Sequence, residues 1–347
     1  MCCHGVVKSS KTVAQGRALA LRAAIDPRRR RGQKRAMLPS HSWILTEDYA
    51  GLRAQALGLA EAAGLAPDIR VLRARGLWRQ VPAAWWPRPL SVIAPAALAP
   101  PWPELAIGCG GKSAAVLAAL APRMRVVIVQ HPRMSVRRFD LVVAARHDEL
   151  TGPNVLVTRT ALHRVTPSRL AAAAAAWQAR LAALPRPLVA VLVGGSNGRF
   201  RLDAAVGARL AGQLAEMMQR DRVGVALTPS RRTDPAVRAL LRDRLAPLGG
   251  WVWDMEGENP YFGLLALADA IVVTGDSVSM LSEAVATTAP VLLAALPGRS
   301  RRIGLFTGGL IDDGRMRPFA GRFEHWPVAP VDDTAVVAAE MCRRFGY

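Results

Sequence analysis

The chain has 347 residues, is 51% hydrophobic and carries a formal net charge of +20 at pH 7. The length exceeds the size at which a single core stops growing, so we expect two domains, and the apolar content excludes a chain that is disordered throughout. Residues 1–40 hold ten of the Lys and Arg against one acid, Asp26, and no recognition motif accompanies the charge. We therefore expect no specific nucleic-acid partner.

Cysteine usage and hydropathy indicate the compartment. The four cysteines, Cys2, Cys3, Cys109 and Cys342, show neither metal-ligand spacing nor a disulfide framework, which indicates a reducing environment. No apolar run approaches the ~20 residues of a membrane span, and the amino terminus lacks the order of a signal peptide. We therefore expect a cytoplasmic protein.

Residues 1–40 are predicted to be a disordered basic extension. They contain the run Arg28–Arg31 and show no apolar periodicity, so they cannot bury enough surface to offset the entropy of ordering. Met37 lies just before the first predicted strand, so the stretch is alternatively an extension from an upstream start codon. The fold is expected to begin at residue 41.

Residues 41–165 alternate strands and helices as a Rossmann-like domain does. The helix Leu52–Ala63 has apolar residues at helical spacing and ends at Gly64, and an alanine-rich helix ends at Leu120. The predicted strands are Ser42–Leu45, a short strand between Glu104 and Gly108, Arg125–Gln130, Leu141–Ala144 and Asn154–Arg159.

The turn Gly110-Gly111-Lys112-Ser113 connects that short strand to the alanine-rich helix. A strand, a glycine turn and a helix start favour anion binding, and Gly-Lys-Ser is similar to a P-loop. A P-loop requires a glycine five residues before Gly111, and Ala106 is there instead. We therefore do not favour an NTPase.

Three residues of the first domain are candidates for a general base. Asp48 lies in the polar loop Thr46–Gly51, and His131 and His147 each follow a predicted strand. Ligands of parallel α/β sheets bind at the carboxyl ends of strands, where these residues fall. A lone His at such a place is more often an ordinary hydrogen-bonded loop residue, and the spacing does not choose among the three.

The segment Arg73–Pro89 interleaves basic residues with Trp78, Trp85 and Trp86 and contains several prolines. Trp and Arg in an irregular segment suit a bilayer surface or a partner interface. The alternative, which we favour at this point, is a loop whose tryptophans fold back on the core.

The pattern restarts after a linker, residues 166–186, that contains the helix Arg169–Ala183 and its proline-rich end. Residues 187–330 form the second predicted domain, and 331–347 contain a last helix, Asp333–Arg344. The strands of the second domain are predicted at Leu188–Val193, Val223–Leu227, Trp251–Trp253, Ala270–Val273 and Val291–Ala295. Its helices are predicted at Ala204–Met218 and Val278–Thr287.

The loop before the helix Val278–Thr287 is where we expect chemistry. Asp276, Ser277 and Ser279 offer side-chain oxygens, and the helix start offers unpaired N–H groups, so the same atoms can cap the helix or hold a phosphate. Glu283 lies one or two turns further on and is expected to reach a sugar hydroxyl of the same ligand. The alternative is an ordinary capped helix with a solvated glutamate.

The chain carries a set of motifs that are specific when taken together. They are Ser230-Arg231-Arg232-Thr233, Asn259-Pro260-Tyr261, Ala268-Asp269, Thr274 through Glu283, Phe139-Asp140-Leu141-Val142-Val143, His147-Asp148, Gly152-Pro153-Asn154-Val155 and Arg317-Pro318-Phe319. In these motifs it resembles the mitochondrial fission (elongated mitochondria) family of bacteria and plants. The resemblance implies an α/β, GT-B glycosyltransferase-like fold, with two Rossmann-like domains facing a cleft and the last helix packing back on the first domain.

The chain departs from the family pattern in the first domain, where a GT-B enzyme holds its acceptor. Family members usually have Asn-Gln where this chain has Ala54-Gln55, and an arginine-containing turn where it has Gly110-Gly111-Lys112. The acceptor is therefore left open.

A more distant resemblance links the second domain to the bacterial glycosyltransferase that adds N-acetylglucosamine to lipid-linked peptidoglycan precursors. The resemblance implies that a glycine loop and a helix start take a diphosphate, that Arg231 stabilises it as it leaves, and that Glu283 takes a ribose. The implied donor-site residues are Gly194, Gly195, Ser196, Asn197, Ser230, Arg231, Asn259, Asp276, Ser277, Ser279 and Glu283.

The resulting hypothesis is a transferase that uses a nucleotide-diphosphate sugar on an unknown acceptor. Protein dipoles and arginine supply the charge, so we expect no metal and no other cofactor. The alternative is a non-catalytic scaffold of the same fold that recruits a partner to a membrane surface. For that alternative the expected place is the inner face of the membrane, to which the protein would be bound peripherally.

Overall fold

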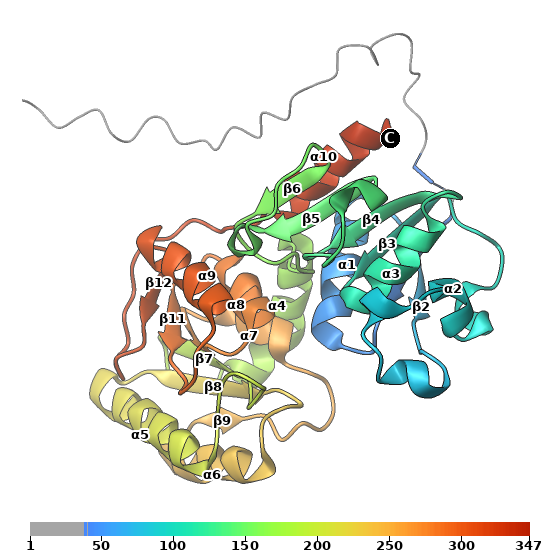
Figure 1. Ribbon diagram of the computed structural model, residues 1–347. Helices are drawn as coiled ribbons and strands as arrows, with labels where there is room; N and C mark the ends of the chain where they lie inside the picture. The colour runs from blue at the N-terminus through green and yellow to red at the C-terminus, as the bar shows by residue number, and fades with distance from the viewer. Residues whose placement is uncertain (1–37, 40) are drawn as a thin grey trace, which may run out of the picture. The chain divides into compact units, whose positions relative to one another are not determined.

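The computed structural model describes residues 38, 39 and 41–347. The predicted basic extension, residues 1–40, therefore lies outside the described residues except for Leu38 and Pro39. The described residues form two parallel six-stranded sheets, and helices cover both faces of each sheet (Figure 1). This is the arrangement that the alternation of strands and helices predicts.

The first sheet has the strand order β2-β1-β3-β4-β5-β6, with every neighbouring pair parallel. The strands are β1 (Ser42–Thr46), β2 (Asp68–Val71), β3 (Leu105–Cys109), β4 (Arg125–Val129), β5 (Leu141–Ala145) and β6 (Val155–Thr158). The central strands β1, β3, β4 and β5 are almost wholly buried, which is why they are continuous apolar runs without alternation.

Helices cover this sheet on both faces. α1 (Ala50–Ala62) and α10 (Thr334–Phe345) share one apolar cluster with the strands, and α3 (Gly111–Leu120) lies in the cluster on the other face. α2 (Pro89–Val92) and the short turns η2 (Gly76–Arg79), η3 (Ala83–Trp85) and η4 (Pro95–Leu98) lie between β2 and β3 in the sequence, and α2 and η3 contact α3. The remaining short turns of this half are η5 (Val136–Arg138) and η6 (Arg146–Asp148).

The second sheet has the order β12-β11-β10-β7-β8-β9 and is also parallel throughout. Its strands are β7 (Leu188–Val193), β8 (Gly224–Pro229), β9 (Trp251–Val252), β10 (Ala270–Thr274), β11 (Val291–Ala294) and β12 (Met316–Pro318). The chain order reverses between the neighbours β7 and β10, and in open α/β sheets such a switch point is where ligands bind.

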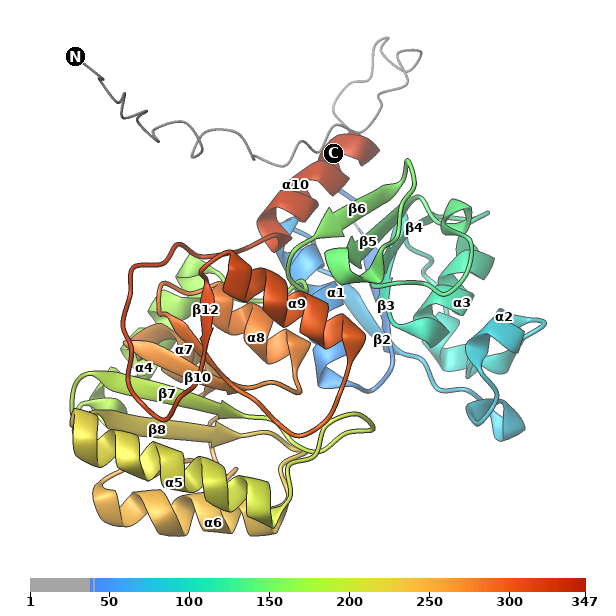
Figure 2. The same cartoon turned by 60° about the vertical axis from the view of Figure 1, so that its left-hand side comes forward.

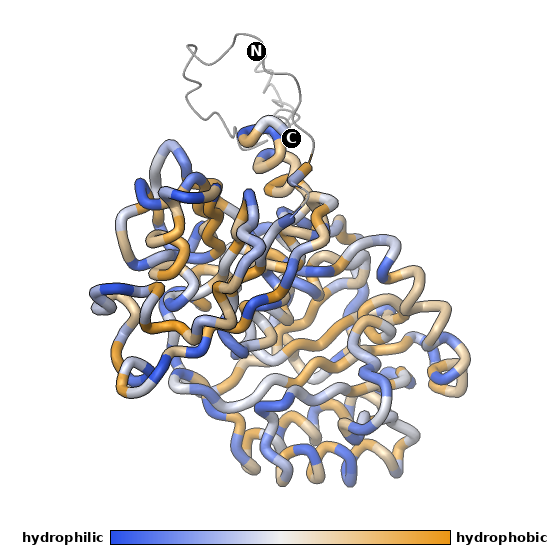
Figure 3. Tube along the Cα trace, turned by 90° about the vertical axis from the view of Figure 1, so that its right-hand side faces the viewer, coloured by the Kyte–Doolittle hydropathy of each residue, from blue (hydrophilic) through white to orange (hydrophobic). Residues whose placement is uncertain are grey.

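The helices of this half are α4 (Pro167–Leu181), α5 (Ala204–Asp221), α6 (Pro235–Leu245), α7 (Tyr261–Leu267), α8 (Val278–Val285) and α9 (Arg301–Asp312), with the turn η7 (Ala246–Leu248) after α6. α5 and α6 pack on one face of the sheet, and α4, α7, α8 and α9 pack on the other (Figure 2). Figure 3 shows the hydrophobic runs of the chain concentrated in the interior strands. Each sheet thus has its own pair of apolar clusters.

The carboxyl-terminal helix α10 belongs to the core of the first sheet. Val337, Ala338, Met341 and Phe345 are buried in the cluster that contains α1, as the family resemblance implies. Asp333, just before the helix, accepts hydrogen bonds from the backbone N–H groups of Arg159 (2.5 Å) and Thr160 (3.1 Å). These bonds fix the start of α10 against the segment that follows β6.

Several elements are not among the predictions. β2 is exposed or half-buried along its length and β12 has a single buried residue, so both lack the apolar run that identifies the other strands. α6 and α9 begin with ordinary capping signals, Asp234-Pro235 and Ser300, which we did not interpret as helix starts. In the described part of the chain, no helix is both long enough and apolar enough to cross a membrane.

Candidate functional site

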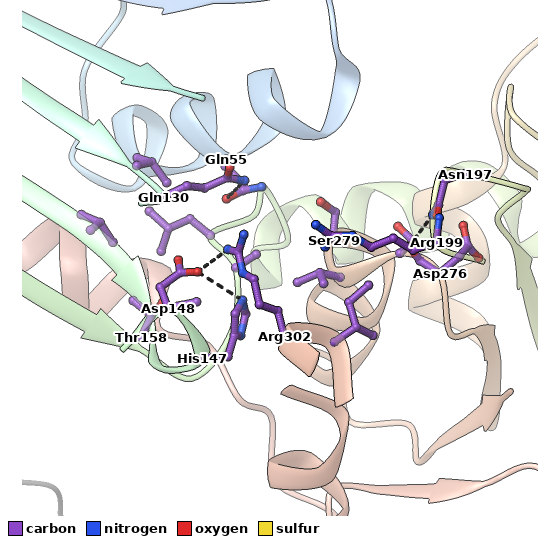
Figure 4. A pocket seen from close by; sticks show the side chains of 18 of the residues that line it. Gln55, Gln130, His147, Asp148, Thr158, Asn197, Arg199, Asp276, Ser279 and Arg302 are labelled. Carbon is purple, nitrogen blue, oxygen red and sulfur yellow. Dashed lines mark hydrogen bonds and ion pairs between the residues drawn. The ribbon is translucent and has the colours of Figure 1, made fainter. Parts of the chain in front are cut away.

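A cavity of about 340 Å³ lies at the carboxyl ends of strands from both sheets, next to the switch point between β7 and β10 (Figure 4). Figure 4 shows Gln55, Gln130, His147 and Asp148 on one side and Asn197, Arg199, Asp276 and Ser279 on the other, with Arg302 reaching Asp148. The lining residues are Gln55, Val129, Gln130, Val143, Ala145, His147, Asp148, Thr158, Ala161, Leu162, Asn197, Arg199, Arg232, Asp276, Ser277, Val278, Ser279, Arg302 and Ile303.

The glycine loop after β7 is built around the Asp276 carboxylate, which is fully buried. Asp276 accepts hydrogen bonds from the Thr274 hydroxyl (2.7 Å) and the Gly195 N–H (3.1 Å), and it pairs with the Arg232 guanidinium (2.7 Å). A Cβ at Gly194 would lie 2.2 Å from both carboxylate oxygens, so only glycine fits there. Asp276 therefore holds the loops after β7, β8 and β10 together and is itself charge-compensated.

The amino terminus of α8 points a set of backbone donors at the cavity. Ser277 is its N-cap, and the Ser277 hydroxyl accepts a hydrogen bond from the Met280 N–H at 3.3 Å. Ser277, Val278 and Ser279 line the cavity, and the first N–H groups of a helix have no acceptor within the helix. The helix dipole adds positive potential at the same point, so this edge of the cavity favours an anion.

Among the described arginines, three line the cavity, and each comes from a different loop or helix. Arg232 pairs with Asp276, and Arg302, at the start of α9, pairs with the buried Asp148. Arg199 has no carboxylate partner within the described chain; its side chain contacts the Ser300 hydroxyl at 3.4 Å. Arg199 is therefore the cation that is most available to an anionic ligand.

His147 lies on η6, on the side of the cavity that the first sheet provides. Its Nε2 is 4.0 Å from the Asp148 carboxylate, and the edge of its ring contacts Phe306. Burial lowers the pKa of His147; the neighbouring Asp148 raises it in part, and Arg302 lowers it further. The imidazole is consequently neutral at pH 7 and able to accept a proton.

Two glutamines complete this side. The Gln130 amide donates to the Gln55 side-chain oxygen at 3.3 Å, and Gln55 in turn donates to the Gly51 carbonyl. Gln130 directly follows β4 and has φ of 75°, a left-handed conformation that glutamine rarely adopts. Strain of this kind persists where surrounding structure enforces it and often accompanies a binding site.

Of the three candidate bases, His147 is the one that lines the cavity. Asp48 lines a separate hollow together with Glu47 and Lys112. The His131 Nδ1 accepts a hydrogen bond from the Arg133 N–H at 2.8 Å, as an ordinary loop histidine does. The structure thus brings one of the three candidates to the donor-side residues.

The predicted donor-site residues divide into two groups. Asn197, Asp276, Ser277 and Ser279 line the cavity, and Gly194 and Gly195 lie directly behind Asp276. The others have local structural partners: the Ser196 hydroxyl accepts from Leu202 N–H, the Ser230 hydroxyl from Arg232 N–H, and the Asn259 amide oxygen from Tyr261 N–H. Arg231 is exposed and does not line the cavity; its neighbour Arg232 does.

Glu283 differs from the expectation that it reaches back to the loop. It is buried inside the second half of the chain, where the Tyr261 hydroxyl donates a hydrogen bond to its carboxylate, and it does not line the cavity. Burial raises the pKa of Glu283 to about 7, against the lowering effects of Tyr261 and Arg164. A contact between Glu283 and a ligand therefore stays a prediction that would require the side chain to leave Tyr261.

Sequence reasoning did not single out Arg199, Arg232, Arg302 or the Gln55–Gln130 pair as site residues. Arg199 directly follows the glycine loop, and Arg302 lies in the first turn after the capping residue Ser300, so both positions carried a usable signal. In the described chain, no group of three or more His, Cys, Asp or Glu is arranged to hold a metal ion.

The solved structure of UDP-GlcNAc 2-epimerase from Methanocaldococcus jannaschii is similar to this chain, with a TM-score of 0.53. The two are 12% identical, and the match covers 86% of this chain and 91% of that one. At this level of identity the likeness concerns the fold alone. Together with the two parallel sheets it confirms the expected α/β, GT-B-like fold of two Rossmann-like domains.

Two sequence relatives were found. The mitochondrial fission protein ELM1 of Arabidopsis thaliana is 31% identical over 272 residues, which are 70% of this chain and 64% of that protein. An uncharacterised protein of Rickettsia prowazekii is 25% identical over 161 residues, 44% of this chain and 45% of that one. The chain thus spans less than two thirds of the length of either relative. A family model described as mitochondrial fission ELM1 matches residues 50–345. The chain therefore belongs to the mitochondrial fission ELM1 family.

Proposed function

We propose that the chain binds a nucleotide-diphosphate sugar in the cavity and transfers the sugar to an acceptor. The observation that carries this proposal is the meeting of the α8 amino terminus with Arg199, Arg232 and Arg302 at the β7–β10 switch point. A diphosphate needs several donors and cations at once, and these groups supply both. The epimerase with the similar fold is named after a UDP-sugar, UDP-GlcNAc. That name supports a nucleotide-diphosphate sugar as the ligand of this chain.

In this proposal the diphosphate lies against Ser277, Val278 and Ser279, with Arg199 as its principal side-chain contact. Arg199 has no competing carboxylate in the described chain, so binding an anion does not require an existing ion pair to break. Because guanidinium groups and a helix start stabilise the leaving diphosphate, we assign no metal or other cofactor to the step.

His147 is the proposed general base. In the reaction, an acceptor hydroxyl oxygen forms a bond to the anomeric carbon of the sugar, and the bond from that carbon to the phosphate oxygen breaks. The hydroxyl proton moves to the neutral His147 imidazole, and the nucleoside diphosphate leaves with the electron pair. The lowered pKa of His147 keeps the base form present at pH values below those at which a free imidazole becomes charged.

A nucleotide titration of wild-type protein and the Arg199→Ala variant tests the proposal. Calorimetry with UDP, GDP and ADP sugars should identify a donor that binds wild type. Arg199→Ala should weaken that donor roughly ten- to a hundredfold, since a charge-assisted contact contributes about 1.5 to 3 kcal/mol.

Arg209→Ala, an equal loss of charge on the exposed face of α5, is the matched control and should bind as wild type does. Failure of every nucleotide to bind wild type, or equal affinity in Arg199→Ala and wild type, would contradict the proposal.

A second candidate function is a non-catalytic scaffold of the same fold that acts at a membrane surface. The observation that favours it is an exposed group of Trp and Arg side chains on the first half of the chain, described below. The name of the Arabidopsis relative, a mitochondrial fission protein, agrees with a role at a membrane. The proposed location for either function is the inner face of the membrane, held peripherally.

A further inference from the structure

The segment between Asp68 and Glu104 has an unusual charge distribution. Over residues 69–103 the sequence contains five arginines and four tryptophans, and no acidic residue. The segment begins within β2, ends just before β3 and includes η2, η3, α2 and η4. Every charged side chain of this segment is therefore positive.

The segment is anchored to the first half of the chain. Trp86 is buried in the same apolar cluster as α3, and its Nε1 donates to the Val81 carbonyl at 3.1 Å. Ala74 and Ile93 form an antiparallel bridge, and the Arg75 N–H donates to the Val92 carbonyl at 2.9 Å. Of the tryptophans in Arg73–Pro89, Trp86 thus folds back on the core as the favoured alternative predicts, and Trp78 and Trp85 do not.

The exposed apolar side chains of this segment are large. Leu77 is 84% exposed, Trp85 is 75% exposed and Trp78 is 36% exposed. They lie on η2 and η3, two separate turns that Figures 1 and 2 show next to α2 at the outer end of the first sheet. Side chains of this size on turn tips have no partner surface in the described chain that covers them.

Four arginines lie close to these tips in the sequence. Arg73, Arg75, Arg79 and Arg88 are exposed, and none forms an ion pair within the described chain. Arg70 of the same segment behaves differently: it pairs with Asp68 and lies over the Trp43 ring. We call Leu77, Trp78 and Trp85, together with Arg73, Arg75, Arg79 and Arg88, the Trp–Arg platform.

We propose that the Trp–Arg platform rests on an anionic lipid bilayer, with Leu77 and Trp85 inserted between headgroups. Tryptophan prefers the interface between water and hydrocarbon, and arginines beside it attract anionic headgroups. A protein partner would be expected to meet one continuous apolar face, whereas this surface consists of separate apolar tips on a segment whose charged side chains are all arginines. Complementarity to a uniformly anionic surface therefore favours the bilayer.

The hollow next to the platform shows how local this charge pattern is. It shares Arg73 and Arg79 with the platform and measures about 500 Å³, but Glu47 and Asp48 line it as well, and Glu47 pairs with Lys112 at 2.8 Å. Its mixed charge does not match an anionic surface. No platform residue lines the nucleotide cavity, so the inference stands or falls independently of the proposed transferase activity, whereas the scaffold alternative depends on it.

Sedimentation with vesicles tests the proposal on the full chain. Vesicles of phosphatidylcholine with phosphatidylglycerol are compared with vesicles of phosphatidylcholine alone. Wild type should partition at least tenfold more strongly onto the anionic vesicles, and Leu77→Ser/Trp85→Ser should lose at least tenfold of that partition. Melting temperature and nucleotide affinity should not change in the variant, because both side chains are exposed and neither lines the cavity.

The basic residues 1–40 also attract anionic vesicles, so a charge-matched pair of variants separates the two effects. Arg75→Ala/Arg88→Ala removes two platform charges, and Arg209→Ala/Arg244→Ala removes two exposed charges on α5 and α6. The proposal predicts a severalfold loss for the first pair and none for the second. Equal effects of the two pairs, or wild-type partition in Leu77→Ser/Trp85→Ser, would overturn it.

Brominated lipids supply an independent readout. Quenching of tryptophan fluorescence by bromine on the upper acyl chain should be substantial in wild type and should fall sharply in Trp78→Phe/Trp85→Phe. Undiminished quenching in that variant would place the contact elsewhere on the chain. Binding to an acidic polypeptide without binding to anionic vesicles would show that the surface serves a protein instead, and would also overturn the proposal.

Discussion

Glu283→Gln should remove a pH dependence of stability that the buried carboxylate creates. In the folded chain the pKa of Glu283 is raised to about 7 from an ordinary value of 4.5, chiefly by burial. Because the folded value lies above the unfolded one, its stabilising effect is complete below pH 4.5 and is lost as the pH rises through about 7. Ionising this group inside the protein therefore costs stability at neutral and alkaline pH.

The size of the effect follows from the difference between the two pKa values. Each pKa unit corresponds to about 1.36 kcal/mol, so the full loss is about 3 kcal/mol, most of it between roughly pH 5 and pH 8. Glutamine keeps an acceptor for the Tyr261 hydroxyl and cannot ionise. The stability of the variant should therefore increase relative to that of wild type as the pH rises. At about pH 8 its melting temperature should be several degrees higher.

Urea denaturation of wild type and variant across this pH range measures the difference in their free energy of unfolding directly. The contributions of the other titrating groups are the same in both proteins and cancel in this difference. Glu216→Gln, the same change at an exposed position on α5, is the control and should show no pH-dependent difference. A difference between Glu283→Gln and wild type that does not change with pH would show that the carboxylate is solvated, and would return Glu283 to the cavity as a candidate ligand.

Three glycine substitutions test the packing. Gly58→Ala should destabilise the fold by about 1 to 3 kcal/mol, because a Cβ would lie 2.2 Å from the His163 carbonyl oxygen; a melting curve measures this. Gly212 lies on α5, and a Cβ added there would have no neighbouring atom within 4 Å. Gly212→Ala should therefore stabilise the fold by about 0.5 to 1 kcal/mol, and a loss of stability in this variant would contradict the reasoning. Gly194→Ala should displace Asp276 and so abolish nucleotide binding in calorimetry, and unchanged affinity would show that the loop geometry is not required.

The strands were predictable because parallel sheets bury them on both faces and make them continuous apolar runs. β2 and β12 were not, since each lies at a sheet edge and is largely exposed or half-buried. The α8 start was predictable as an anion site from its capping residues and the preceding strand. These are local signals, and they depend on neighbours in the sequence.

The rest of the site depends on contacts between distant segments. Asp148 meets Arg302 and Glu283 meets Tyr261 only because the fold brings η6 to α9 and α7 to α8. Helical spacing places Glu283 near the loop in sequence but cannot tell which side of α8 is covered. The choice of His147 among three candidate bases likewise required the structure.

A crystal structure with the nucleotide diphosphate that binds most tightly tests the central claim most directly. The account predicts density for the diphosphate at the α8 amino terminus, within hydrogen-bonding distance of the Ser279 N–H and the Arg199 guanidinium. Density for the diphosphate at another site, or an empty cavity in crystals saturated with a nucleotide that binds in solution, would contradict it.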